Sequence, residues 1–120
     1  MICLVDMQTK STTQQKEKHM FRILVILNDA PYGSERSYNG LRLADSLARK
    51  EAVEVRVFLM GDSVMCAKSG QITPQGYYNV ERMLKPVLRG GQVAACGTCM
   101  EARGMTPDML AEGVHKGTLD

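Results

Sequence analysis

Aromatic residues are scarce in this chain, and tryptophan is absent. Phenylalanine and tyrosine together make up 5% of the 120 residues, so a platform on which nucleic-acid bases stack is not expected. The chain also has little excess of charge of either sign. The formal net charge is only +2, which is too small to indicate a nucleic acid or an anionic membrane surface as a partner.

Long hydrophobic runs are also missing. No run is long enough to cross a bilayer, and the apolar residues 1–5 are too few for a secretory signal and follow no basic segment. We therefore expect the four cysteines to lie in a reducing cytoplasm. There a closely spaced pair is more often catalytic or metal-binding than a structural disulfide.

The composition along the chain predicts one folded domain after a polar start. Residues 1–19 are rich in Gln, Thr, Ser and Lys beyond the first five and are predicted to be a disordered arm, with Met20 as an alternative start. Residues 20–120 are enough for a single domain. We expect this second segment to hold the entire fold.

Apolar runs alternate with helical patterns across the predicted domain. Strands are expected over 21–27, 53–60 and 92–95, and helices over 35–50 and 78–88. Such alternation predicts right-handed crossovers and a parallel sheet. The predicted fold class is α/β, with three layers (α/β/α) around a mostly parallel sheet.

The helix over 35–50 shows its pattern clearly. Ser34 is expected to be its N-cap, since a hydroxyl there can accept a hydrogen bond from a free backbone N–H. The residues expected to face the sheet recur at helical spacing; they are Leu41, Ala44, Leu47 and Ala48.

Cys96 and Cys99 are the strongest functional signal. They follow a short apolar run and precede a predicted helical turn, so they are expected at the carboxyl edge of the sheet. Free N–H groups there stabilise a thiolate, and ligands collect there in open α/β sheets. Three interpretations remain: a redox or sulfur-relay pair, half of a metal site, and structural cysteines. The metal interpretation is weakened because one such pair supplies only two of the four ligands of a closed zinc site.

Other chemistry-bearing residues carry weaker signals. Arg103 lies one helical turn after Cys99, where it either steadies a thiolate or an anionic sulfur donor, or is a solvated helix residue. Cys66 is expected to be a buried small hydrophobe at the same edge, and His115 to be solvated. No glycine-rich phosphate-binding pattern is present, and neither a cofactor nor a metal is predicted.

The order of these segments resembles the DsrE/DsrF-like family, in particular its small YchN-type branch. The similarity covers about residues 20–119, and the matching segments are Ile23 to Leu27, Ala30-Pro31-Tyr32-Gly33-Ser34-Glu35, Leu41 to Ala44, Val57 to Met60, and Cys96-x-x-Cys99-x-x-x-Arg103-Gly104. The resemblance implies a compact α/β fold that assembles as homo-oligomers, as trimers or hexamers. It also implies sulfur-relay chemistry, in which a cysteine takes sulfane sulfur from a protein donor as a persulfide and passes it to a protein acceptor.

The resemblance also implies which cysteine is reactive. In the sulfur-transferring members the reactive cysteine lies seven residues before the Arg-Gly pair, which is Cys96 here. The resemblance thus implies Cys96 as the persulfide carrier, and its place nearest the strand end and the helix N-terminus predicts that it is the more reactive thiol. Cys99 is a second thiol seen in the YchN-type branch, and we infer that it releases sulfur by forming a disulfide. Arg103 is the third expected site residue. The rival interpretation is a non-catalytic oligomeric protein that binds a small molecule or a metal.

The chain also departs from the family pattern. Members normally continue past Leu119 with one more helix and a final strand, whereas this sequence stops at Asp120. We therefore expect a fold that is truncated at its C-terminal end.

Overall fold

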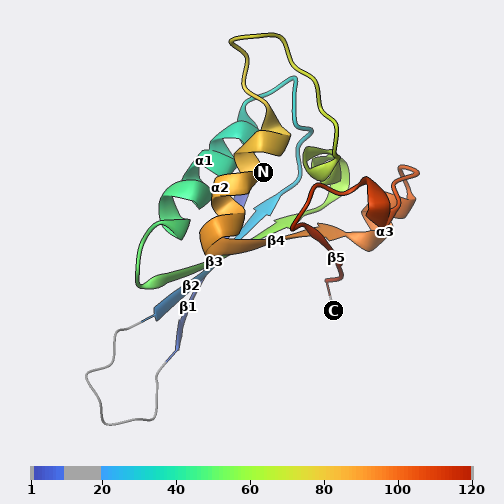
Figure 1. Ribbon diagram of the computed structural model, residues 1–120. Helices are drawn as coiled ribbons and strands as arrows, with labels where there is room; N and C mark the ends of the chain where they lie inside the picture. The colour runs from blue at the N-terminus through green and yellow to red at the C-terminus, as the bar shows by residue number, and fades with distance from the viewer. Residues whose placement is uncertain (1, 10–19, 120) are drawn as a thin grey trace.

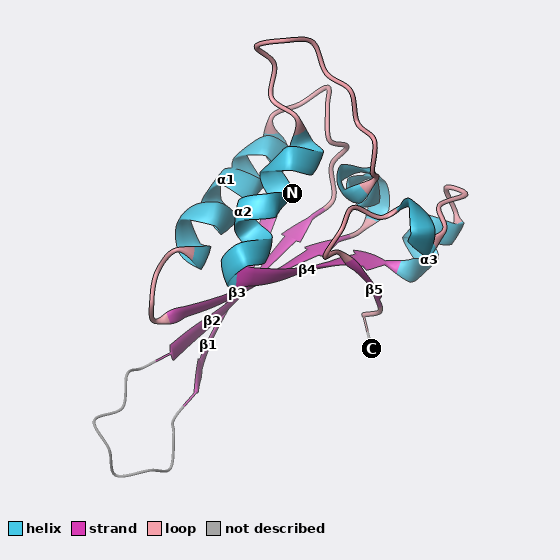
Figure 2. Ribbon diagram, in the orientation of Figure 1, coloured by secondary structure: helices cyan, strands magenta, loops and turns pink. Residues whose placement is uncertain are grey.

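The protein is built around a five-stranded sheet. The computed structural model describes residues 2–9 and 20–119, and Figures 1 and 2 show the arrangement. The strands lie in sequence order across the sheet; they are β1 (Ile2–Thr9), β2 (Met20–Leu27), β3 (Val53–Leu59), β4 (Gly91–Cys96) and β5 (His115–Gly117). Among the five described strands, only β1 is antiparallel to its neighbour. The prediction of an α/β fold with a mostly parallel sheet is confirmed.

The two long helices, α1 (Arg36–Ala48) and α2 (Val80–Gly90), lie side by side on the same face of the sheet (Figure 1). The strand residues beneath them are almost fully buried because side chains alternate between the two faces. These residues are Val25, Leu27, Val55, Val57, Leu59, Val93 and Ala95. On the helices, Leu41, Ala44, Leu84 and Val87 complete the core.

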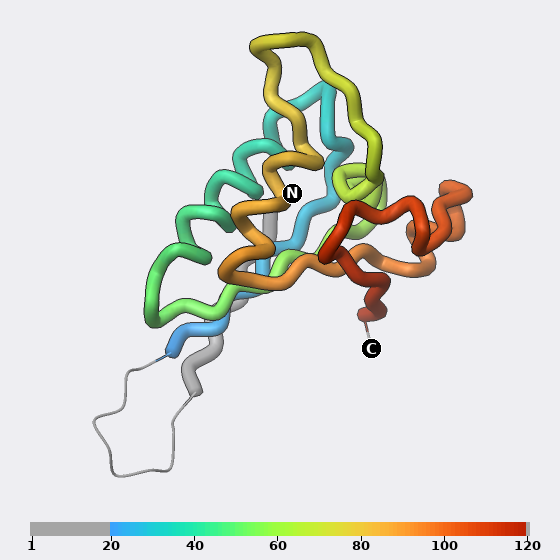
Figure 3. The backbone as a smooth tube through the Cα atoms, viewed as in Figure 1, coloured from blue at the N-terminus to red at the C-terminus, as the bar shows by residue number. Residues whose placement is uncertain are grey.

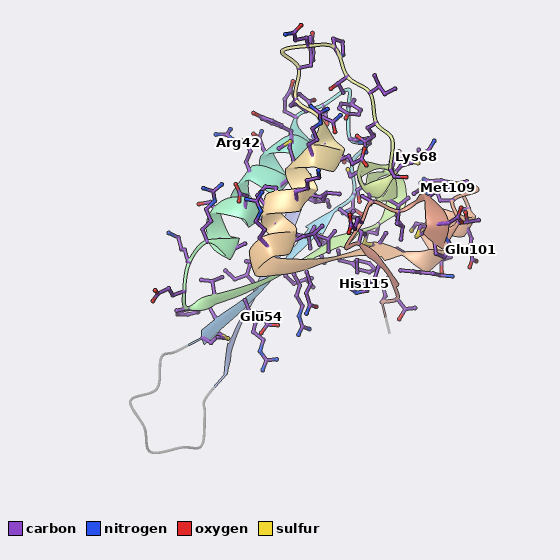
Figure 4. The ribbon with its side chains drawn as sticks, in the orientation of Figure 1. Arg42, Glu54, Lys68, Glu101, Met109 and His115 are labelled. Atoms are coloured by element: carbon purple, nitrogen blue, oxygen red, sulfur yellow. The ribbon has the colours of Figure 1, made fainter. Side chains whose placement is uncertain are left out.

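The expected second helical layer is not seen in the described part of the chain. Right-handed crossovers place successive helices on one face when each new parallel strand is added on the same side. The order β2-β3-β4-β5 never reverses, so both long helices lie together. The opposite face carries half-buried Leu24 and Ile26 and exposed Arg56, and Glu54 projects there, away from the helices (Figure 4).

The expected disordered arm is also corrected. Residues Ile2–Thr9 form β1, which pairs along its whole length with β2, from Ile2 opposite Leu27 to Thr9 opposite Met20. Residues 10–19 lie outside the described residues. The composition of the arm hid this strand, because the polar residues that follow Val5 dominate residues 1–19, and an edge strand needs only one neighbour for its backbone ladder.

The helix starts differ from expectation in one detail. The N-cap of α1 is Glu35, whose side chain makes no capping bond, while the Ser34 hydroxyl lies 3.5 Å from Asp29 Oδ2. In α2, by contrast, the Asn79 side chain accepts a hydrogen bond from the Arg82 N–H at 3.1 Å, which satisfies one of the free donors of that helix end.

Several shorter elements gather at the carboxyl ends of the parallel strands. They are the 3₁₀ helices η1 (Gly61–Ala67) and η2 (Pro107–Met109) and the short helix α3 (Gly97–Glu101). Figure 3 shows the backbone passing from β4 into α3 and returning to β5 beside β4. Among the described helices, none combines the length and apolar character needed to span a bilayer.

Candidate functional site

The two cysteines lie where β4 ends and α3 begins. Cys96 is the last residue of β4 and Cys99 the third residue of α3. The α3 segment contacts η1, which follows the neighbouring strand β3. Parallel strands end at a common edge, so the segments after β3 and β4 together form the site. Figure 4 shows Glu101 at the end of α3 on this side of the molecule.

The thiols of Cys96 and Cys99 are free and close enough to interact, since the side chain of Cys96 is one cause of the lowered pKa of Cys99. They differ in accessibility. Cys96 is buried, with 6% of its surface exposed, whereas Cys99 is half-buried. A contact of this kind brings two sulfur atoms close enough for exchange chemistry, and a reagent from solvent meets Cys99 first.

Gly61 brings a backbone donor to the Cys99 thiol. It opens η1 with φ +58°, a conformation that suits glycine. The turn is held by the Leu27 carbonyl oxygen, which accepts hydrogen bonds from the Met60 N–H at 3.0 Å and from the Ser63 hydroxyl. The Gly61 N–H donates to Cys99. The end of β2 therefore fixes a donor for a thiol that lies after β4.

These contacts lower the pKa of the Cys99 thiol below its ordinary 9.0. The hydrogen bond from the Gly61 N–H is the largest cause and the interaction with the Cys96 side chain the second. Burial opposes both, and the positive charge of Arg103 adds a smaller lowering. Donors directed at sulfur favour the thiolate over the thiol.

Arg103 is held by two partners rather than left in solvent. Its Nε and Nη2 donate to Asp62 Oδ1 at 3.1 and 2.9 Å, and its Nη1 donates to the Cys99 carbonyl oxygen at 3.1 Å. Asp62 is exposed, so the pair contributes little to stability. Its effect is positional, because it joins η1 to the end of α3 and keeps a positive charge near the thiols.

The structure thus brings Cys96, Cys99 and Arg103 together, and the greater reactivity of Cys96 stays a prediction. That expectation relied on the helix N-terminus next to Cys96. The helix has only five residues, and its dipole is correspondingly small. A further backbone donor comes from Gly61 on another segment, and it lowers the pKa of Cys99.

Sequence reasoning missed Gly61 and Asp62. A signal was available, because both residues directly follow the second predicted strand and a parallel sheet places that strand end beside Cys96. Which donor reaches which sulfur depends on the spacing between strands, which no local pattern contains.

Cys66 lies in the same region but apart from the pair. It is fully buried, as expected, and its Sγ is 4.0 Å from the Asp29 carbonyl oxygen. Burial raises the pKa of its thiol from 9.0 to about 12, and a hydrogen bond with Ser37 opposes the shift. Such a thiol is inert near neutral pH.

Strand β5 closes the site from the other side. The Lys116 side chain occupies the space beside Gly97, and its Nζ lies 3.2 Å from Glu101 Oε1. His115 is exposed within β5. Across residues 20–119, whose side chains the structure describes, no three His, Cys, Asp or Glu side chains meet as a metal site would require. Cys96 and Cys99 by themselves would supply two thiolate ligands.

Comparisons with known proteins agree with this architecture. Protein YchN of Escherichia coli K12 is 40% identical over 102 residues, covering 83% of this chain and 86% of that protein. Protein MK0008 of Methanopyrus kandleri is 38% identical over 97 residues, covering 81% and 79%. The crystal structure of YchN from E. coli superposes with a TM-score of 0.71 over 80% of this chain and 82% of that one.

A more distant structure shares the fold alone. MTH1491 from Methanobacterium thermoautotrophicum is 20% identical, with a TM-score of 0.63 and 80% of each chain covered. The model of the DsrE/DsrF-like family matches residues 22–120, which include the strands β3 to β5 and the Cys96/Cys99 pair. The chain therefore belongs to the DsrE/DsrF-like family.

Proposed function

We propose that the protein is a sulfur relay that carries sulfane sulfur as a cysteine persulfide on the Cys96/Cys99 pair and passes it to a partner protein. The family suggests a sulfur-relay role. The observation that carries the proposal is the contact between two free thiols beside the Gly61 N–H, which lowers the pKa of one of them. A thiolate is the species that exchanges sulfur.

The reaction needs no cofactor. A thiolate of the pair attacks the outer sulfur of a donor persulfide, a new S–S bond forms, and the donor leaves as a thiolate with the electron pair. An acceptor thiolate then attacks the same outer sulfur and returns the protein to its thiolate form. No net oxidation occurs in either step, so the protein acts as a sulfurtransferase or carrier without an external oxidant.

Arg103 is proposed to steady the anionic sulfur species. Its guanidinium is already held by Asp62 and by the Cys99 carbonyl, so the charge stands near the thiols before a donor arrives. A fixed positive charge favours both a thiolate and a persulfide anion. Replacement by methionine is expected to slow sulfur uptake while leaving the sheet and helices in place.

The test is intact-mass analysis after incubation with glutathione persulfide. We expect the wild type to gain one sulfur atom, and the double variant Cys96→Ser/Cys99→Ser to gain none. A reductant should remove the added sulfur, and incubation with a thiol acceptor should transfer it. A wild-type protein that takes up no sulfur and instead binds zinc stoichiometrically would favour the rival metal- or ligand-binding function.

We also propose that the protein works in the cytoplasm as a homo-oligomer, a trimer or a hexamer, between a protein sulfur donor and a protein acceptor. The sheet face away from α1 and α2 supports assembly, because half-buried Leu24 and Ile26 lie there with no described helix above them. Light scattering coupled to size exclusion measures the mass directly, and a monomer at micromolar concentration would contradict this part.

A further inference from the structure

A second positive side chain lies against the short link between the two cysteines. Lys116 stands opposite Ala95 in the pairing of β5 with β4, and its stem passes over Gly97. A Cβ added to Gly97 would overlap the Lys116 Cε and lie 3.2 and 3.3 Å from its Cγ and Cδ. The Lys116 Nζ ends 3.2 Å from Oε1 of Glu101, which Figure 4 shows on α3. A lysine stem packed in this way keeps its charge at the surface beside the link.

Arg103 contacts the same link at its other end. Its Nη1 donates to the Cys99 carbonyl oxygen at 3.1 Å, and its Nε and Nη2 donate to Asp62 Oδ1. The segment that joins the cysteines is therefore contacted by two cations from separate parts of the chain, Lys116 at Gly97 and Arg103 at Cys99.

In both ion pairs the cation is the less exposed partner. The side chain of Lys116 is 43% exposed and that of Glu101 is 70% exposed, while the values for Arg103 and Asp62 are 31% and 66%. A carboxylate that faces solvent is strongly screened and neutralises its cation only in part. Ion pairs this exposed are also weak, so the carboxylate of an arriving molecule can replace Glu101 on Lys116.

Resting on the proposed relay, we propose that Lys116 is a specificity-determining residue that selects sulfur donors with a carboxylate next to their persulfide. Among the residues that the structure describes, Glu101 is the partner of the Lys116 ammonium, which leaves two of its three N–H donors for an incoming group. The ammonium binds the donor carboxylate and so places the persulfide beside the cysteine pair. One carboxylate replaces another, and the exchange moves neither an electron nor a proton.

The first experiment compares iodoacetate, which is an anion, with iodoacetamide, which is neutral. Both reagents alkylate the same thiolate, so the ratio of their rates on the peptide that holds Cys96 and Cys99 cancels any change in thiol pKa and reports the local charge. We expect Lys116→Met, whose unbranched stem still covers Gly97, to lower this ratio about threefold. Lys116→Arg is expected to restore the ratio.

Two further variants control this comparison. Glu101→Gln removes the competing carboxylate and is expected to raise the ratio about twofold, the opposite direction from Lys116→Met. Lys85→Met changes the net charge by the same amount on exposed α2 surface and should leave the ratio unchanged. Thermal unfolding of each variant verifies the fold. A ratio that Lys116→Met does not lower, or that Lys85→Met lowers equally, would overturn the inference.

Sulfur uptake separates the inference from the relay itself. The donors are glutathione persulfide and two persulfidated peptides whose cysteine is flanked by glutamates or by lysines, and the gain of sulfur is followed by intact mass. Comparison of wild type with Lys116→Met cancels the intrinsic reactivity of each donor. We expect the variant to lose about threefold in its preference for the glutamate-flanked peptide, mainly through KM.

Each outcome of the uptake experiment has a distinct meaning. A loss of preference with the peptides would assign the carboxylates to a protein donor, and a loss with glutathione persulfide alone would assign them to a small thiol. No loss with either would refute the selection by Lys116 while leaving the relay intact. Absence of uptake by the wild type from every donor would refute the relay, and the alkylation ratio would still decide the role of Lys116.

Discussion

Cys66 makes the stability of this protein depend on alkaline pH in a predictable way. Its thiol is fully buried, and burial raises its pKa from 9.0 to about 12. In the unfolded chain the thiol ionises at its ordinary pKa, whereas in the folded protein it stays protonated. Because the pKa is raised in the folded protein, this thiol contributes to the free energy of unfolding. The contribution is fully present below pH 9 and is lost as the pH rises toward 12.

The magnitude follows from the two pKa values. At pH 8 the unfolded chain gains only about 0.1 kcal/mol from ionisation of this thiol, but at pH 10 it gains about 1.4 kcal/mol. Between pH 9 and pH 12 the free energy of unfolding falls by about 4 kcal/mol from this thiol alone. That is a large part of the roughly 5–15 kcal/mol by which a domain is stable. The effect should therefore be visible well before pH 12.

The assay is urea unfolding under reducing conditions at pH 8 and pH 10, for wild type and Cys66→Ala. Alanine cannot titrate and leaves a small cavity whose cost does not depend on pH, and the other titrating groups cancel in the comparison. We expect the wild type to lose about 1.3 kcal/mol more than the variant between the two pH values. Equal losses would refute the reasoning, since they would show that Cys66 ionises as easily in the folded protein as in the unfolded chain.

Three further predictions concern the scaffold of the site. Deletion of residues 1–19 is expected to lower the melting temperature by several degrees, because β2 loses the backbone partner that β1 provides. Gly91→Ala should lower the free energy of unfolding, measured in urea, by about 1–3 kcal/mol, since the added Cβ would lie 2.6 Å from the Val55 carbonyl oxygen. Tyr32→Phe should lower the free energy of unfolding by about 1–3 kcal/mol, because the buried Val80 N–H, 3.1 Å from the Tyr32 hydroxyl, loses its acceptor.

Each of these has a matched control or a decisive opposite outcome. Gly97→Ala also crowds a neighbour, but that neighbour is the flexible Lys116 side chain, so it should cost much less than Gly91→Ala. Tyr77→Phe changes a ring that is 71% exposed and should be neutral. An unchanged melting temperature after removal of residues 1–19 would show that β1 adds nothing to the fold.

The sequence was sufficient for the elements whose signals are local. The apolar run before Asn28 and the alternation of strand and helix patterns predicted β2, α1, β3, α2 and β4 close to their observed bounds. Gly97 and Thr98 set the spacing of the two cysteines, which placed the pair at a strand end. These features depend on side-chain period and on turn residues within a few positions of each other, so a single sequence contains them.

The tertiary structure decided the features that depend on the order of the strands in the sheet. The unreversed order β2-β3-β4-β5 placed both long helices on one face, where the sequence had predicted layers on both. It also placed Gly61, after β3, next to Cys99, after β4, and so lowered the pKa of that thiol. The sequence determined which residues can react, because that is a property of side chains. Only the packing of distant segments determined which donors surround those residues, because hydrogen-bond donors act through space over a few ångströms.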